Sequence, residues 1–165
     1  MDDKDILRGG DHIYFPRPFA EGLIASMTND EHKAQLAFAA ARTEQEKIVQ
    51  AQPDHPFPLC VLGVIDAALG RKEEALREGW RAVQLFPVEK DAVDGKLLVK
   101  YLAIIASWVG EKGLACEQLA LVTRTPGSPV SYGALKLNPL WDPLRGQPCF
   151  EKIVASLTPK ETVSK

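Results

Sequence analysis

The chain has 165 residues, a net charge of −2, and ordinary globular proportions of hydrophobic (45%) and charged (25%) residues. This length fits one domain, and the charge balance argues against a surface that neutralises nucleic-acid phosphates. The longest apolar run, Leu102 to Val109, is far shorter than the ~20 residues that span a bilayer, and the acidic first residues lack the apolar stretch of a secretory signal. We therefore expect neither nucleic acid nor membrane as a partner.

The cysteines indicate a compartment. Cys60, Cys116 and Cys149 are odd in number, widely spaced, and contain no CxxC pair. Such a set favours buried, reduced thiols over a disulfide framework. The sequence therefore predicts a cytoplasmic protein.

Residues 1–17 are expected to form an irregular arm. Gly9-Gly10 and the prolines Pro16 and Pro18 interrupt any regular pattern there. The aromatic pair Tyr14-Phe15 supplies the apolar surface with which the arm would dock on the first helices.

Residues 18–53 read as a first helical hairpin. A short helix should run from Pro18, a favoured first helical residue, to Met27. Asn29 and Asp30 form the turn, with Asp30 as the N-cap of a long second helix. Apolar residues recur in that helix at helical spacing until Pro53 ends it.

Residues 56–87 form the clearest hairpin. Gly70 separates its two helices, at a point where a residue without Cβ ends a helix easily. Small residues lie where antiparallel helices would touch, and small side chains permit close approach. These residues are Gly63, Ala75 and Ala82.

A third hairpin spans residues 95–124, with its turn at Gly110. A C-terminal cap spans 131–158 and begins with Ser131 as an N-cap. Three prolines between Asn138 and Pro148 forbid a continuous helix there. The final helix then places apolar residues on one face, namely Phe150, Ile153, Val154 and Leu157.

The central hairpin resembles the tetratricopeptide repeat, whose ~34-residue pattern combines Leu-Gly, two alanines and a closing proline. The same pattern recurs from Phe15 and from Lys96, while Asp66 and Gly79 stand where the pattern has aromatic residues. The resemblance implies an all-α tetratricopeptide-like solenoid of three hairpins. An atypical last unit, here the C-terminal cap, would cover its apolar end.

The segment NPLWDPLRGQPCF resembles the ending of a bacterial group of tetratricopeptide-like regions. In that group the region follows kinase, cyclase or winged-helix domains of multidomain signalling proteins. The resemblance implies a fragment or lone relative of such a region, with a regulatory or sensory role. Gly146-Gln147 and Cys149 depart from the pattern of that group.

No catalytic constellation is visible in the sequence. The histidines at 12, 32 and 55 have no metal-binding spacing, and the serines lack a nucleophile motif. The acidic residues alternate with basic ones, which is typical of solvated helix faces. We expect no enzyme activity, no metal and no cofactor.

The resemblance implies that the first helix of each hairpin lines a concave face. That face would be apolar with one cation, and would suit an amphipathic helix or an apolar strip of a partner protein. The loop at Glu89-Lys90-Asp91 would help to select the partner by its charge. The expected partner-binding residues are Phe57, Cys60, Val64, Leu97, Lys100, Ile104 and Trp108.

Two arrangements of this face remain open. An open face with an exposed Trp108 predicts a protein- or peptide-binding scaffold, with a homodimer as one form. A face covered by the arm or by a tight superhelix makes the same residues core. A small-molecule sensor with a pocket enclosed between arm and solenoid is the alternative function. Trp80 and Trp141 are expected in the core.

Overall fold

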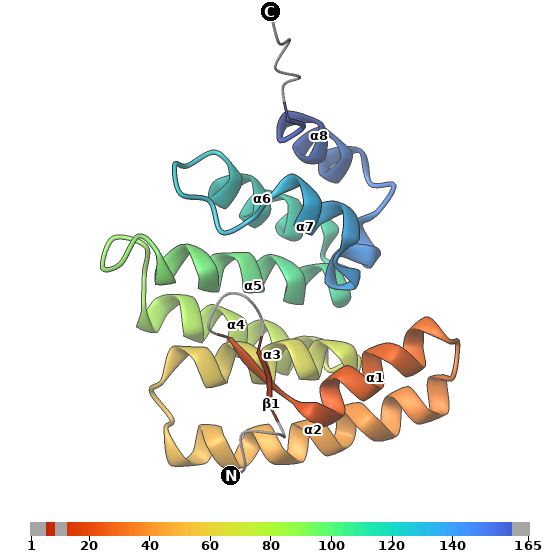
Figure 1. Cartoon of the computed structure of the whole chain (residues 1–165). Coiled ribbons are helices and arrows are strands. Elements are labelled where there is room, and N and C mark those ends of the chain that lie inside the picture. The colour runs from red at the N-terminus through yellow and green to blue at the C-terminus, as the bar shows by residue number, and fades with distance from the viewer. Residues whose placement is uncertain (1–5, 9–12, 160–165) are drawn as a thin grey trace, which may run out of the picture.

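The computed structural model of the chain describes residues 6–8 and 13–159, and these residues are mostly helical (Figure 1). The elements in chain order are β1 (Ile6–Arg8), β2 (Tyr14–Pro16), α1 (Arg17–Met27), α2 (Glu31–Ala51), α3 (Pro56–Ala68), α4 (Lys72–Leu85), α5 (Asp94–Trp108), α6 (Lys112–Thr123), α7 (Tyr132–Leu137), the 3-10 helix η1 (Pro139–Leu144) and α8 (Pro148–Ser156). The all-α prediction is confirmed at this level. The sequence also predicts a frayed end over residues 160–165, and these lie outside the described residues.

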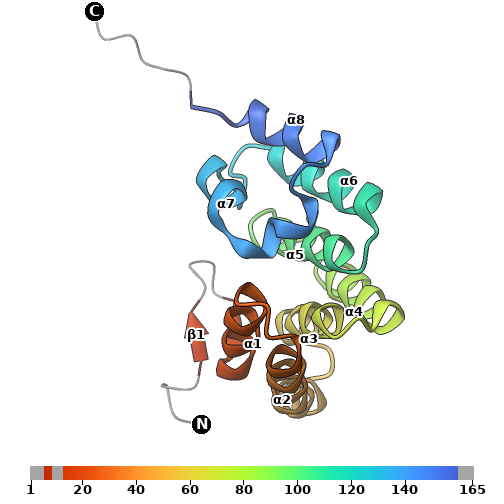
Figure 2. The same ribbon diagram turned by 90° about the vertical axis from the view of Figure 1, so that its right-hand side faces the viewer.

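The helices pair along the chain. α1 packs on α2, α3 on α4 and α5 on α6, and neighbouring pairs are in contact through α2 with α3 and α4 with α5. Seen along the helices, the pairs follow an arc with α1, α3 and α5 on its inner side (Figure 2). α7, η1 and α8 lie at the far end of this arc. Short turns between helices therefore build a stack whose inner side is lined by alternate helices.

Local sequence explains where the helices begin and end. The Asp30 side chain accepts a hydrogen bond from the backbone N–H of Lys33, so it caps α2 as predicted. Ser131 caps α7 by accepting from the N–H of Ala134. Gly70 and Gly110, which follow α3 and α5, have φ of 75° and 84°, a backbone conformation that side chains with a Cβ rarely adopt. The predicted boundaries of these helices hold to within about one residue.

The arm is more regular than predicted. β1 and β2 pair as antiparallel strands, with Leu7 opposite Phe15, so this part of the chain is a small hairpin instead of an irregular segment. Phe15 is buried, and its ring stacks on Phe19 of α1 with centroids 4.6 Å apart. The predicted docking of Tyr14-Phe15 on the first helices is therefore confirmed for Phe15, while Tyr14 is 44% exposed.

The core runs through the whole stack and includes the cap. Trp141 is buried and stacks on Phe150 of α8, which confirms its core assignment. Trp80 was predicted in the core and is 38% exposed, because it follows Gly79, which occupies the position on α4 that faces α5. Within the described residues, every helix is too short or too polar to cross a lipid bilayer.

The cysteine prediction is wrong. Cys116 of α6 and Cys149 of α8 form a disulfide, and Cys60 is free and buried. The helix packing brings the two Cα atoms to 6.0 Å, within the range that a disulfide bridges, although 33 positions separate them in sequence. The cytoplasmic prediction rested on reduced thiols and loses that support.

Candidate functional site

The structure places most of the predicted partner-binding residues inside the molecule. Of the seven, four are buried in the core, which are Cys60, Val64, Leu97 and Ile104. Phe57, Lys100 and Trp108 are half-buried. These positions do lie on α3 and α5, the inner helices of the arc, as the repeat pattern implied. They do not form an open surface.

The arm fills the inner side. Ile13 is completely buried, and the Phe15 ring lies 6.0 Å from the ring of Tyr101 on α5. The arm thus bridges from α1 to α5 across the face that a partner was predicted to occupy. Of the two arrangements left open by the sequence, the structure has the covered one.

Trp108 and Lys100 are engaged within the chain. The Trp108 indole N–H donates to the backbone carbonyl of Leu140 in η1 over 2.8 Å, which ties α5 to the cap. The Lys100 ammonium lies 4.8 Å from the centroid of the Tyr101 ring. The Trp108 indole and the Lys100 ammonium therefore both contact other residues of the same chain.

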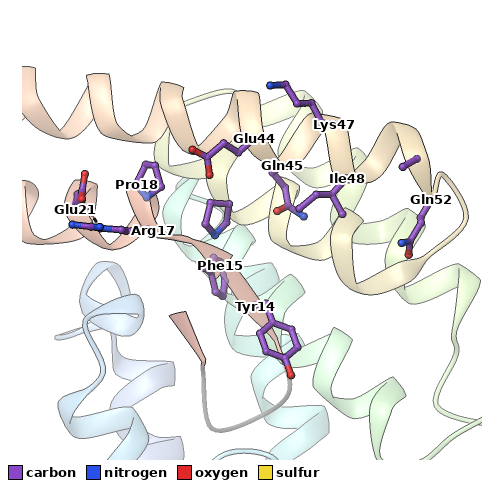
Figure 3. A pocket seen from close by; sticks show the side chains of 12 residues that line it. Tyr14, Phe15, Arg17, Pro18, Glu21, Glu44, Gln45, Lys47, Ile48 and Gln52 are labelled. Atoms are coloured by element: carbon purple, nitrogen blue, oxygen red, sulfur yellow. Dashed lines mark hydrogen bonds and ion pairs between the residues drawn. The ribbon is translucent and has the colours of Figure 1, made fainter. Parts of the chain in front are cut away.

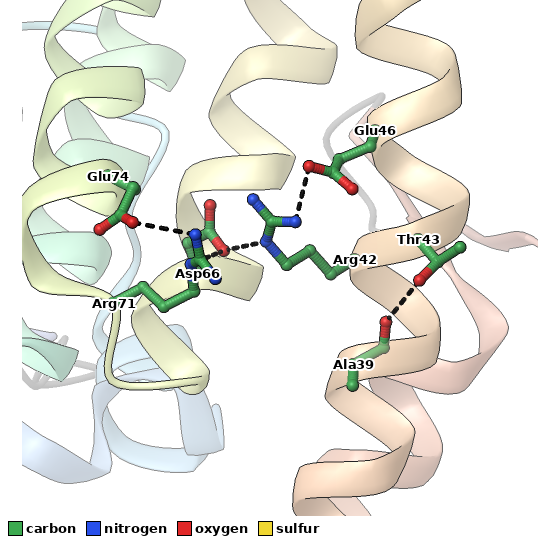
Figure 4. Close-up of polar contacts among 7 residues, drawn as sticks. All are labelled: Ala39, Arg42, Thr43, Glu46, Asp66, Arg71 and Glu74. Atoms are coloured by element: carbon green, nitrogen blue, oxygen red, sulfur yellow. Dashed lines mark hydrogen bonds and ion pairs between the residues drawn. The ribbon is translucent and has the colours of Figure 1, made fainter.

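A buried charge cluster lies between α2, α3 and α4 (Figure 4). Asp66, fully buried, accepts from the Arg42 guanidinium at 2.6 Å and pairs with Arg71 at 3.2 Å, both through Oδ1. Arg42 also pairs with Glu46, and Arg71 with Glu74. Because a buried carboxylate without partners is costly, the two guanidinium groups are what make Asp66 tolerable inside the stack.

Glu78 of α4 completes this cluster. Burial, together with the charge and the hydrogen bond of Asp66, raises the pKa of Glu78 to about 8. Asp66 Oδ2 and Glu78 Oε2 are buried and have no N–H donor within the described residues. Because its pKa is raised to about 8 and its side chain is hydrogen-bonded to that of Asp66, Glu78 is the protonated member of the pair near neutral pH.

A pocket of about 730 Å³ lies between the arm, the start of α1 and the second half of α2 (Figure 3). We call it the arm pocket. Its size is within the range of roughly 300–1,000 Å³ that is usual for small-molecule sites. The residues that line it are Tyr14, Phe15, Pro16, Arg17, Pro18, Glu21, Glu44, Gln45, Lys47, Ile48, Ala51 and Gln52.

Gln45 fixes one wall of the arm pocket. Its side chain is 2% exposed, and Nε2 donates to the backbone carbonyl of Pro58 at 2.9 Å, which joins α2 to α3. Its Oε1 has no donor within the described residues and is out of contact with solvent. Gln45 therefore holds the wall in position but offers a ligand no open acceptor.

Sequence reasoning missed the charge cluster, and it named a pocket between arm and solenoid only as an alternative, without its residues. Asp66 had a visible signal, since it is the only charged residue between Pro56 and Leu69, in a helix that the repeat pattern places inside. The arm pocket had no comparable signal, because it joins residues 14–21 to residues 44–52 through the course of the arm over α2. Neither feature is a metal centre: in the part of the chain that is described, no group of three or more His, Cys, Asp or Glu side chains is placed to hold a metal ion.

Comparisons of the chain with protein-family models, with curated proteins and with solved structures find no match. The candidate sites therefore rest on geometry alone.

Proposed function

We propose that the chain is a non-catalytic helical domain that binds a small molecule in the arm pocket, with the sensory role that its resemblance to bacterial signalling regions implies. The observation that carries this proposal is the pocket itself: it is of ligand size, is largely lined by apolar and aromatic groups, and has charged groups at its edge. The covered inner face supports the same choice, because the predicted scaffold surface is occupied by the arm.

The stacked hairpins support a tetratricopeptide-like solenoid as the frame of this domain. A Cβ on Gly63 would lie 2.8 Å from Ile105 Cδ1 and 3.1 Å from the carbonyl oxygen of Ala75, so this glycine permits close approach of the helices. Ala75 and Ala82 are buried at the same contact between α3 and α4. Such a frame holds α1 and α2 rigid enough to keep the pocket preformed.

The test is a fragment screen observed through the backbone amide signals of the ¹⁵N-labelled protein. A set of small apolar fragments should shift the amides of residues 14–21 and 44–52 together. Ala51→Trp should abolish these shifts, since Ala51 is exposed and lines the pocket, so a large side chain there occupies it. Ala40→Trp is the matched control, because Ala40 is an exposed residue of α2 outside the lining.

Fragments that shift amides of α3 and α5 instead would contradict the proposal and indicate an inner face that opens in solution. Equal binding to wild type and to Ala51→Trp would also contradict it.

A protein-binding scaffold is the second candidate, with a second copy of the chain as its partner. Ile24 and Met27, one turn apart on α1, are 63% and 66% exposed and lie outside the arm pocket. Exposed apolar pairs of this kind are frequent at protein contacts. Light scattering should then give a dimer mass that falls to the monomer in the Ile24→Glu/Met27→Glu variant. A wild-type protein with the mass of a monomer would rule out the homodimer.

A further inference from the structure

The charges around the arm pocket are not balanced. Four charged side chains line it, and two of them neutralise each other, because Arg17 Nε donates to Glu21 Oε1 at 3.1 Å. Glu44 and Lys47 form no ion pair within the described residues. Their directions therefore decide the charge that a ligand meets.

Glu44 and Lys47 point in different directions. Figure 3 shows the Glu44 carboxylate turned from α2 toward the arm, above the side chains that follow β2, whereas Lys47 extends away from the other lining residues. Gln45, between them, keeps both of its polar atoms buried. The Glu44 carboxylate is thus an accessible anion beside the pocket, and no cation among the described residues pairs with it.

The walls of the arm pocket suit a ligand with a compact apolar group. Pro16, Pro18 and Ile48 supply apolar surface to the lining, and the partly exposed Tyr14 ring lines the pocket as well. An aromatic ring attracts a cation through its negative face, and the exposed Glu44 carboxylate does so through its charge. Both groups repel an anion.

We infer that the arm pocket binds an organic cation, namely a protonated amine carried on a compact apolar body. The ammonium group donates hydrogen bonds to the Glu44 carboxylate, and the apolar body covers the proline and isoleucine walls. This inference deepens the proposed function and rests on it. An inorganic cation does not fit, because one carboxylate and apolar walls supply too few oxygen ligands.

The test compares three probes that share one ring, which are benzylamine, benzyl alcohol and benzoate. Near neutral pH they are cationic, neutral and anionic. Amide shifts of residues 14–21 and 44–52 are followed during titration into the wild-type protein. Benzylamine should bind about two- to fivefold more tightly than benzyl alcohol, since an exposed ion pair adds modestly to affinity, and benzoate more weakly than either.

Two variants assign the preference to Glu44. Glu44→Gln keeps the size of the side chain and should make benzylamine bind no better than benzyl alcohol, with benzyl alcohol unchanged. Glu31→Gln makes the same change on the same helix, about 20 Å away by the ~1.5 Å rise per residue, and should keep the preference. Added salt should weaken the binding of benzylamine and leave that of benzyl alcohol unchanged.

The outcomes separate the two proposals. If all three probes bind equally in the pocket, or if Glu44→Gln keeps the preference, the cation inference is overturned while the pocket remains a ligand site. If benzylamine fails to shift the pocket amides while the apolar fragment set does, the cation inference is overturned and the proposed small-molecule site is kept. If neither benzylamine nor the fragments shift these amides, the inference and the proposed function fall together.

Discussion

The two ends of the helix stack are finished differently. At the C-terminal end, η1 and α8 cover the last pair, Trp141 is in the core, and a disulfide joins α6 to α8 (Figure 2). At the N-terminal end, the arm covers α1 and α2 only in part, and the arm pocket lies where this cover is incomplete. A stack of helix pairs exposes an apolar face at each end. One end is closed by a cap and a cross-link, and the other retains the arm pocket, where we propose that a ligand binds.

Removal of the disulfide at the C-terminal end should have the largest effect on the free energy of unfolding. The double variant Cys116→Ala/Cys149→Ala removes a cross-link over 33 positions, which in the chain-entropy description contributes about 3–4 kcal/mol to the free energy of unfolding. Urea denaturation should show this loss. Wild type in reductant should match the variant, and the variant itself should not respond to reductant. Equal stability of oxidised wild type and variant would mean that α8 is held by packing alone.

The closed end also shows where sequence reasoning succeeds. Ser131, the prolines around η1 and the apolar face of α8 act locally, and they predicted the cap with its boundaries close to those observed. The disulfide depends on how α6 and α8 pack, and no local pattern reports that distance. Proline and capping signals therefore predicted the helices of the cap. The disulfide between α6 and α8 could be found only from the three-dimensional packing of these helices.

At the open end, local signals were again right and the surface prediction was incomplete. Asp30 and Asn29 form the expected turn, with Asn29 at a φ of 59°. Val64 and Ile104, which the repeat pattern assigned to a concave face, are buried in α3 and α5. That pattern carries no information on the arm, whose buried Ile13 and Phe15 cover that side. A pocket beside the arm was an alternative in the sequence analysis, but its lining residues on α2 were not predicted.

The packing beneath the open end can be tested with one methyl group. A Cβ on Gly22 would lie 2.5 Å from Phe38 Cε1, and Phe38 is itself buried against Phe19. Gly22→Ala should therefore lower the free energy of unfolding by about 1–3 kcal/mol through overpacking. Thermal unfolding measures this change.

Gly113→Ala is the matched control. Gly113 is exposed in α6, and a Cβ there would have nothing within 4 Å. This variant should be stabilised by roughly 0.5–1 kcal/mol, because alanine favours the helix over glycine. If both variants are stabilised, α1 and α2 are farther apart in solution than the structure shows.

Between the two ends, the buried charge cluster predicts a pH dependence. The folded-state pKa of Glu78 is about 8, above the ordinary value of 4.5. The folded state therefore holds a proton that the unfolded chain releases at lower pH. The stabilising contribution of this group is complete below about pH 4.5 and is lost as the pH rises through about 8.

Glu78→Gln should remove this contribution to the slope, since an amide does not titrate and can still donate a hydrogen bond to Asp66. Wild type and variant should differ least at low pH, and the variant should gain relative stability as the pH rises to 9. Glu73→Gln, an exposed change on the same helix, should follow wild type throughout. Parallel curves for wild type and Glu78→Gln would show that Asp66 and Glu78 do not share a proton.

The smallest effect is expected where the molecule is open. Ala51→Trp adds a large side chain at an exposed position beside the arm pocket, and should change the free energy of unfolding by no more than about 0.5 kcal/mol. Ala40→Trp should do the same. If the pocket accepts the indole without loss of stability, the empty pocket contributes nothing to the free energy of unfolding. If Ala51→Trp instead destabilises the protein by more than its control, the arm closes on this position in solution, and both ends of the stack are sealed.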